Sequence, residues 1–204
     1  MVLGFVESAT WAILPRTLAI YRKLYPDVKI SLQPLHTVNQ INAIRDGKID
    51  IGILGKPVDD SALSVYTLRK ECYLVALPGD HPLVSKVKIH IKDLAQESFV
   101  TTLRAVGAPY YDSMIKVCMD ENFSPSIIQT ATDMQTVLAL VSSGMGIALI
   151  NESARHIRDD VVYKPLFGAN QIAYQMSFAW RTGNESHVIK NFLNVIQRLY
   201  LRSI

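Results

Sequence analysis

Apolar and polar positions alternate along the chain with two different periods, one typical of strands and one typical of helices. Val2 to Val6 is an unbroken apolar run that predicts a buried strand, and the polar turn after it opens a helix with apolar positions at Leu14, Leu18 and Tyr21. Val28 to Leu35 alternates apolar and polar residues and predicts a second strand. Strands and helices that follow one another in this way favour an α/β fold with a mainly parallel sheet.

The stretch "NQINAIRDGKIDIGIL" predicts a helix, a glycine stop and a strand. Thr37 and Gln40 have the spacing of a capping box at the start of the helix, and Ile41 and Ile44 fall on its core face. Gly47 lies where a left-handed C-cap is expected. The apolar run "IDIGIL" is then the next buried strand.

The middle of the chain repeats this arrangement. Two extended runs, Leu63 to Leu68 and Tyr73 to Leu77, are followed by a short helix in "IKDLAQ", a strand at Phe99 to Thr102 and an amphipathic helix at Tyr110 to Asn122. "SIIQTA" is the next strand. A helix follows that begins with a second T-x-x-Q pattern, at Thr132 and Gln135, and ends at one of the two glycines in "SGMG" before the strand "IALI".

The last part of the chain predicts a long strand at Tyr174 to Gly183 and an amphipathic final helix. Two extended crossings on either side of one α/β block indicate a discontinuous first lobe with a second lobe inserted into it. The predicted fold class is therefore α/β and two-lobed, each lobe a mostly parallel sheet flanked by helices. We predict lobe I over residues 1–71 and 176–204, and lobe II over residues 72–175, with a cleft between the lobes.

Composition narrows the class of protein. Apolar residues make up 49% and charged residues 19% of the 204 residues, which is typical of a well-buried globular chain. The net charge is +3 and no Lys/Arg cluster exceeds a pair, so this chain alone is not expected to bind DNA strongly. No apolar segment has the length of a membrane span and the first residues lack a secretion signal, so we expect a cytoplasmic protein without membrane contact. Cys72 and Cys118 are predicted to be reduced core cysteines.

Neither a metal site nor a catalytic site is predicted. The five histidines are scattered and have no cysteine or histidine partner at ligand spacing. The sequence contains no nucleophile elbow, no phosphate-binding loop and no dinucleotide fingerprint. We therefore predict a non-enzymatic domain that needs no cofactor.

Several motifs together resemble one family. "ILP" at Ile13, "YP" at Tyr25, "IRDGKIDIGI" from Ile44, "HPL" at His81 and "LVSSGMGIALI" from Leu140 are similar, in order and spacing, to the effector-binding domain of LysR-type transcriptional regulators. The resemblance covers essentially the whole chain. It implies a fold like that of the type 2 periplasmic binding proteins, with a small effector between the lobes and with self-association as a dimer, or as a tetramer in the full-length form.

Two departures from the family pattern affect this interpretation. The family's DNA-binding helix-turn-helix would precede residue 1, so we expect a regulatory fragment that reaches promoter DNA only through that missing domain. Asn151 stands where the family usually has a proline. The stretch "RAVGAPYY" is specific to this chain, and for this reason the effector cannot be copied from relatives.

Ligands of open α/β sheets bind at the carboxyl ends of strands, where loops lead into helix N-termini. Hydroxyl side chains dominate these positions here, and helix N-termini attract anions, so a carboxylate is the expected ligand. The resemblance adds Gly55 and supports Ser8, Thr37, Thr101 and Thr102. The predicted ligand-binding residues are Ser8, Thr10, Thr37, Gly55, Thr101, Thr102 and Asp133.

Alternatives remain for single residues. Thr37 and Thr132 act as N-caps, as ligand contacts, or as both. Arg104 either contacts the ligand's carboxylate or faces solvent, and Trp11 either walls the cleft or packs in the core. The region from Tyr21 to Tyr25 and the final helix serve either as faces for self-association or as core.

The functional prediction is a domain that senses a small carboxylate-type effector in a bacterial transcriptional regulator. The alternative is a solute-binding protein of a transport system with the same fold, which would carry a secretion signal instead of a helix-turn-helix. An enzyme on this fold would need a charged catalytic residue in the cleft, and none is evident.

Overall fold

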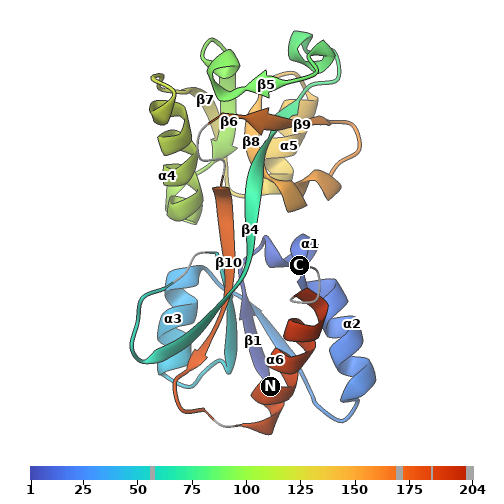
Figure 1. Ribbon diagram of the computed structural model, residues 1–204, viewed down its shortest axis with the longest axis vertical. Helices are drawn as coiled ribbons and strands as arrows, with labels where there is room; N and C mark the ends of the chain where they lie inside the picture. The colour runs from blue at the N-terminus through green and yellow to red at the C-terminus, as the bar shows by residue number, and fades with distance from the viewer. Residues whose placement is uncertain (56–57, 169–171, 185, 201–204) are drawn as a thin grey trace. The chain divides into compact units, whose positions relative to one another are not determined.

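The computed structural model describes residues 1–55, 58–168, 172–184 and 186–200. The chain divides into two compact units (Figure 1): unit 1 is Met1–Arg69 with Gln175–Ile204, and unit 2 is Lys70–Tyr174. The chain crosses from one unit to the other inside two strands, β4 (Leu63–Leu77) and β10 (Ile172–Arg181). This is the α/β fold with two connecting strands that the sequence predicts.

Unit 1 is a sheet covered by helices on both faces. Its elements are β1 (Val2–Phe5), α1 (Ala9–Ala12), α2 (Leu14–Leu24), β2 (Ser31–Pro34), α3 (Thr37–Arg45), β3 (Ile51–Leu54), the first half of β4, the second half of β10, and α6 (His187–Tyr200). The strand order is β2-β1-β3-β10-β4. β1 runs parallel to β2 and β3, and β10 is antiparallel to β3. The carboxyl ends of β1, β2 and β3 therefore lie at one edge of the sheet.

Side-chain alternation along the strands separates two cores in unit 1. Phe178 in β10 meets the ring of Phe192 in α6, and Phe192 in turn meets Tyr21 in α2. The next residue of β10, Ala179, points to the other face and joins Ile44 of α3 in a second cluster. α2 and α6 thus pack together on one face, and α3 covers the other (Figure 1).

Unit 2 contains two groups of strands joined through β8. Its elements are the second half of β4, β5 (Ile89–His90), β6 (Ser98–Thr102), α4 (Arg104–Asp120), β7 (Ser126–Ala131), α5 (Met134–Ser142), β8 (Ala148–Asn151), β9 (Val162–Phe167) and the first residues of β10, with 3-10 turns at Pro82–Ser85, Ile91–Leu94 and Glu152–His156. β4 pairs antiparallel with β8 and β9, β5 runs parallel to β9, and β6 runs parallel to β7.

The two groups of strands in unit 2 meet where Ile147 lies beside β6. The Val100 amide donates to the Ile147 carbonyl and the Ile147 amide donates to the Ser98 carbonyl, both at 2.8 Å. Gly146 precedes this contact, and a Cβ atom built on it would lie 2.6 Å from the Ser98 carbonyl oxygen. Only glycine allows the two backbones to approach this closely.

Several sequence-based boundaries need correction. The first predicted helix is divided at Ile13 into α1 and α2. The two extended runs around residue 70 form one strand of 15 residues, because the polar residues between them continue the β conformation. α4 begins at Arg104, earlier than predicted, and is interrupted by non-helical dihedral angles at Gly107. β5 and β9 were not predicted.

The two cysteines differ in environment. Cys118 is fully buried, and burial raises the pKa of its thiol to about 12. Cys72 is exposed, which corrects the prediction that both are core residues. Both are free thiols.

Candidate functional site

Parallel strand ends gather three of the predicted residues of unit 1. Ser8 follows β1, Thr37 follows β2 and Gly55 follows β3, and these three strands are neighbours that run in the same direction. Backbone hydrogen bonds hold the ends in line, from the Val6 amide to Ile53 and from the Leu35 amide to Phe5. The sequence-based placement of these residues at one sheet edge follows directly from the parallel pairing.

Thr37 and Gly55 are joined to each other. The Gly55 amide donates to the Thr37 hydroxyl oxygen at 3.1 Å, so the loop after β3 is fixed to the first residue of α3. This contact corrects the predicted capping box. His36 is the N-cap residue, Thr37 is already helical, and the side chain of Gln40 binds elsewhere.

The N-terminus of α3 carries no protein anion of its own in the part of the chain that the structure describes. His36 makes no side-chain cap, and the first turn contains no acidic residue. The first amides of a helix have no partner within the helix, so those of α3 remain available to an anionic group.

Thr10 and Trp11 contribute less directly. Thr10 is exposed, and its hydroxyl donates to the Glu7 carbonyl at 2.7 Å, within its own turn. Trp11 is half-buried, and its indole Nε1 is a buried donor that has no partner among the described residues. Its ring is therefore partly buried.

In unit 2, Thr101 and Thr102 end the buried strand β6. They are 4% and 8% exposed, and the Thr101 hydroxyl has no hydrogen-bond partner within the described ranges. The Leu103 amide donates to the Ala131 carbonyl at 2.8 Å, which ties the loop after β6 to the end of β7. The strand-end hydroxyls of unit 2 are therefore held in a defined place.

Asp133 is the N-cap of α5. Its carboxylate accepts from the Thr136 amide at 2.7 Å, from the Thr136 hydroxyl at 3.0 Å and from the Thr132 hydroxyl at 3.2 Å. Sequence reasoning assigned this cap to Thr132 with Gln135, which is wrong because the carboxylate one residue later reaches the amide. Asp133 also places a negative charge where the α5 N-terminus would otherwise attract an anion.

We expect Asp133→Ala to lower the free energy of unfolding by about 1 kcal/mol at neutral pH, because the Thr136 amide loses its acceptor. The Thr136 amide is the chief reason that the pKa of Asp133 lies below its usual value. This stabilisation is therefore complete above about pH 4 and is lost as the pH falls through the lower pKa of the folded state. Chemical unfolding at pH 7 and at pH 2–3 measures it.

Asp133→Asn is the matched control for this cap. Asparagine is an equally good N-cap residue, so this variant should stay near wild-type stability at pH 7 without the pH dependence of the carboxylate. An alanine variant as stable as the wild type at pH 7 would contradict the assignment.

Arg104 is paired within α4. Its guanidinium donates to both carboxylate oxygens of Asp112, at 2.7 and 3.0 Å, across the break at Gly107. Hydrogen bonds from Arg104 are the main cause that lowers the pKa of Asp112. Both side chains are exposed, so Arg104 faces solvent and its charge is already partly balanced.

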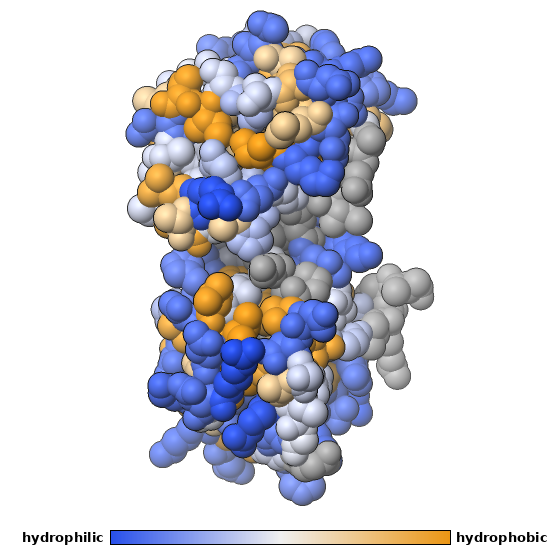
Figure 2. Space-filling model, turned by 90° about the vertical axis from the view of Figure 1, so that its left-hand side faces the viewer, coloured by the Kyte–Doolittle hydropathy of each residue, from blue (hydrophilic) through white to orange (hydrophobic). Residues whose placement is uncertain are grey.

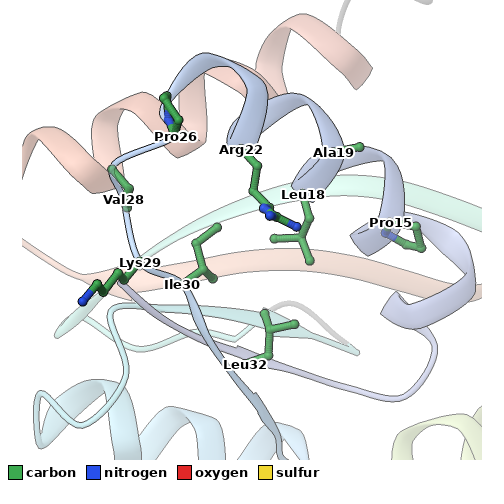
Figure 3. Close-up of a pocket in the computed structure, with 9 residues that line it drawn as sticks. All are labelled: Pro15, Leu18, Ala19, Arg22, Pro26, Val28, Lys29, Ile30 and Leu32. Atoms are coloured by element: carbon green, nitrogen blue, oxygen red, sulfur yellow. The ribbon is translucent and has the colours of Figure 1, made fainter.

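A groove of about 630 Å³ lies in unit 1 between α2 and β2 (Figure 3). It contains none of the seven predicted ligand-binding residues. Its lining is mostly apolar, with Arg22 and Lys29 as its charged members. The lining residues are Pro15, Leu18, Ala19, Arg22, Pro26, Val28, Lys29, Ile30 and Leu32.

The described residues contain neither a metal-ligating cluster nor a membrane-spanning helix. No group of three or more His, Cys, Asp or Glu side chains gathers there in a way that could hold a metal ion. Among the same residues, no helix is both long enough and apolar enough to span a bilayer.

Comparison with known proteins decides the family. Residues 1–200 match the family described as LysR substrate binding domain. The chain belongs to this family. AlsR, an HTH-type transcriptional regulator of Bacillus subtilis (strain 168), is 36% identical to this LysR substrate-binding domain over 196 residues, which are 96% of the chain and 65% of AlsR. The Hca operon transcriptional activator HcaR of Escherichia coli (strain K12) is 30% identical over 198 residues, 97% of the chain and 67% of HcaR.

A solved structure shows the same fold as this LysR substrate-binding domain. The BenM effector binding domain with its effector benzoate superposes with a TM-score of 0.89 at 28% identity, covering 99% of this chain and 92% of that one. The chain spans about two thirds of the length of the curated relatives it matches, 65% for AlsR. These relatives are transcriptional regulators, in agreement with the predicted non-enzymatic domain.

Proposed function

We propose that this domain senses a small carboxylate-type effector for a bacterial transcriptional regulator. The observation that carries the proposal is the common sheet edge of unit 1, where Ser8, Thr37 and Gly55 follow neighbouring parallel strands and α3 begins with an uncapped N-terminus. Hydroxyls and helix amides of this kind bind carboxylates. The bound effector of BenM, benzoate, is a carboxylate and gives the proposal a precedent.

The proposed ligand-binding set keeps every predicted residue and gives each a role. Ser8 and Thr37 of unit 1 and the buried Thr101 and Thr102 of unit 2 donate hydrogen bonds to the effector. Gly55, whose amide donates to the Thr37 hydroxyl, lines the site and holds Thr37 in place. Two further residues, Thr10 and Asp133, border the site. Because Asp133 is a carboxylate, it accepts from a hydroxyl of the effector instead of meeting its negative group.

Effector binding acts on transcription by changing the relative geometry of the two lobes. A ligand shifts such an equilibrium only through unequal affinity for the two conformations. A shift of the population from 1:99 to 99:1 needs about 5.5 kcal/mol. Hydrogen bonds to a charged group contribute about 1.5–3 kcal/mol each, so a few contacts made in only one conformation suffice.

Self-association, promoter binding and the cytoplasmic location also belong to the proposal. The domain would pair with further copies, as a dimer or in a tetramer of the longer protein, and would reach DNA through a separate domain. Tyr21 and Phe192 are used in the core of unit 1. Leu32, which lines the groove between α2 and β2, is 43% exposed, and Leu24, the last residue of α2, is 51% exposed.

A thermal-shift screen with aromatic and aliphatic carboxylates, benzoate among them, tests the proposed function. A true effector at 100 times its dissociation constant adds about 2.7 kcal/mol to the free energy of unfolding. Ser8→Ala and Thr102→Val should each weaken binding of that carboxylate about 10- to 100-fold in calorimetric titration, because each removes a hydrogen bond to a charged group.

Ser85→Ala is the control for these two variants. The Ser85 hydroxyl is exposed and donates to the Pro82 carbonyl of its own turn, so its loss should leave the affinity unchanged. If Ser8→Ala and Thr102→Val both bound the carboxylate as the wild type does, the proposed site would be wrong.

A further inference from the structure

Gln40 is a polar side chain completely buried under α3. It is 0% exposed and lies four residues before Ile44 on the helix face that packs against the sheet. Its amide nitrogen donates two hydrogen bonds, to the Leu35 carbonyl at 2.7 Å and to the Ile53 carbonyl at 3.1 Å. One side chain therefore joins the end of β2 to the end of β3, with α3 as its support.

Two glycines make room for this side chain. Gly4 of β1 and Gly52 of β3 are direct partners in the parallel ladder. A Cβ atom built on Gly52 would lie 2.8 Å from the Gln40 Oε1 atom, and one built on Gly4 would lie 3.1 Å from it. Both strands thus lack a side chain where the Gln40 amide enters.

This arrangement carries an energetic cost. The Gln40 Oε1 atom is buried and has no hydrogen-bond partner in the described part of the chain. A buried polar atom without a partner is unfavourable, and leucine or methionine opposite the same glycines would avoid it. What glutamine adds at this position is the pair of hydrogen bonds from its amide nitrogen, which leucine or methionine could not make.

The two carbonyls that accept these hydrogen bonds lie next to the candidate site. Leu35 lies two residues before Thr37 and Ile53 lies two residues before Gly55, and these two site residues are hydrogen-bonded to each other. Gln40 and the Thr37–Gly55 contact thus close a ring of hydrogen bonds around the carboxyl ends of β2 and β3. Movement of either loop must break one of these bonds.

We propose that Gln40 is a positioning residue that sets the separation of Thr37 and Gly55 at the effector site. The geometric part stands on the contacts of unit 1 alone, whereas its importance for binding rests on the proposed function. Gln40 does not touch the effector. A glutamine on the core face of a helix, opposite two glycines in buried strands, is the sequence signal that would have revealed it.

Amide hydrogen exchange by NMR tests the geometric part without any ligand. Gln40→Met keeps the length and bulk of the side chain but removes both donors. The Gly55 amide should then exchange about 10-fold faster, the effect of losing roughly one hydrogen bond, while the amides inside β1 and β3 change much less. Gln40→Asn, which keeps the amide but shortens the side chain, should give the same local pattern if the methionine variant folds poorly.

Ile44→Val is the matched control, because Ile44 is 1% exposed in the same helix and makes no side-chain hydrogen bond. It should loosen unit 1 as a whole and leave the Gly55 amide changed no more than its neighbours. Equal exchange patterns in the Gln40 and Ile44 variants would overturn the proposal.

Benzoate titration separates this proposal from the proposed function. Gln40→Met should weaken the binding of benzoate, or of the carboxylate that gives the largest thermal shift, about 10-fold more than Ile44→Val does. Undiminished benzoate affinity in a Gln40→Met variant with fast Gly55 exchange would overturn the positioning role at the site. A wild-type protein that binds neither benzoate nor other carboxylates would instead count against the proposed function and would leave the exchange result standing.

Discussion

Phe192→Ala is expected to lower the free energy of unfolding by about 3–5 kcal/mol, the usual cost of removing a buried aromatic ring. Phe192 is 0% exposed, and its ring lies 5.2 Å from the ring of Tyr21 and 6.2 Å from that of Phe178. Its loss leaves a cavity where α6, α2 and β10 meet. Urea unfolding followed by circular dichroism measures the loss.

Leu24→Ala provides the comparison for this core variant. Leu24 lies on α2 as Tyr21 does but is 51% exposed, so its truncation should cost well under 1 kcal/mol. A Phe192→Ala protein as stable as the Leu24→Ala protein would show that α6 does not complete the core of unit 1.

Gly146→Ala is expected to cost about 3 kcal/mol, the upper end of the usual range for overpacking. The added methyl group would lie 2.6 Å from the Ser98 carbonyl oxygen, which is a backbone atom and accepts from the Ile147 amide. The backbone of β6 or β8 must move to relieve the clash. Thermal unfolding by calorimetry is the measurement.

Alanine variants of two other glycines of unit 2 are the controls, because they separate the cost of a steric clash from the cost of a left-handed backbone. Gly144 has φ of +77° with open space around its Cα, so Gly144→Ala should cost only about 1 kcal/mol, from the left-handed conformation. Gly79 has neither a positive φ nor a close neighbour, and Gly79→Ala should be neutral. The close approach at Gly146 would be disproved if its alanine variant were no less stable than the one at Gly144.

Local signals in the sequence predicted the order of the elements. Gly47 has φ of +71° and ends α3 as predicted, and Gly144 does the same for α5. The sequence left two candidates for the end of α5, and the structure assigns them different roles. Gly144 is needed for its conformation and Gly146 for its missing side chain.

Elements that depend on distant partners were not predictable. β5 has two residues and β9 contains Pro165, so neither shows a strand pattern before they pair with each other and with β4. Of the two T-x-x-Q patterns, the first failed for the same reason and the second because of a neighbouring residue. The Thr37 hydroxyl is taken by Gly55, which is 18 residues away, and Asp133 reaches the cap of α5 before Thr132 does.

In the candidate site, too, local features were predictable and contacts between distant residues were not. Strand ends can be read from the sequence, so the placement of Ser8, Thr37 and Gly55 at one sheet edge was predictable. The direction of a long side chain cannot be read in this way. Only the structure shows that Arg104 is held by Asp112 and that Gln40 points at two glycines.

The division of unit 1 between the two ends of the chain has a consequence for biosynthesis. Unit 2 is one continuous segment, Lys70–Tyr174, whereas unit 1 lacks a central strand and the helix α6 until the last 30 residues are translated. Domains generally fold as units, often while the chain is still on the ribosome. The inserted unit can therefore fold first on the ribosome, whereas the sheet of unit 1 stays incomplete until residues 175–200 have emerged.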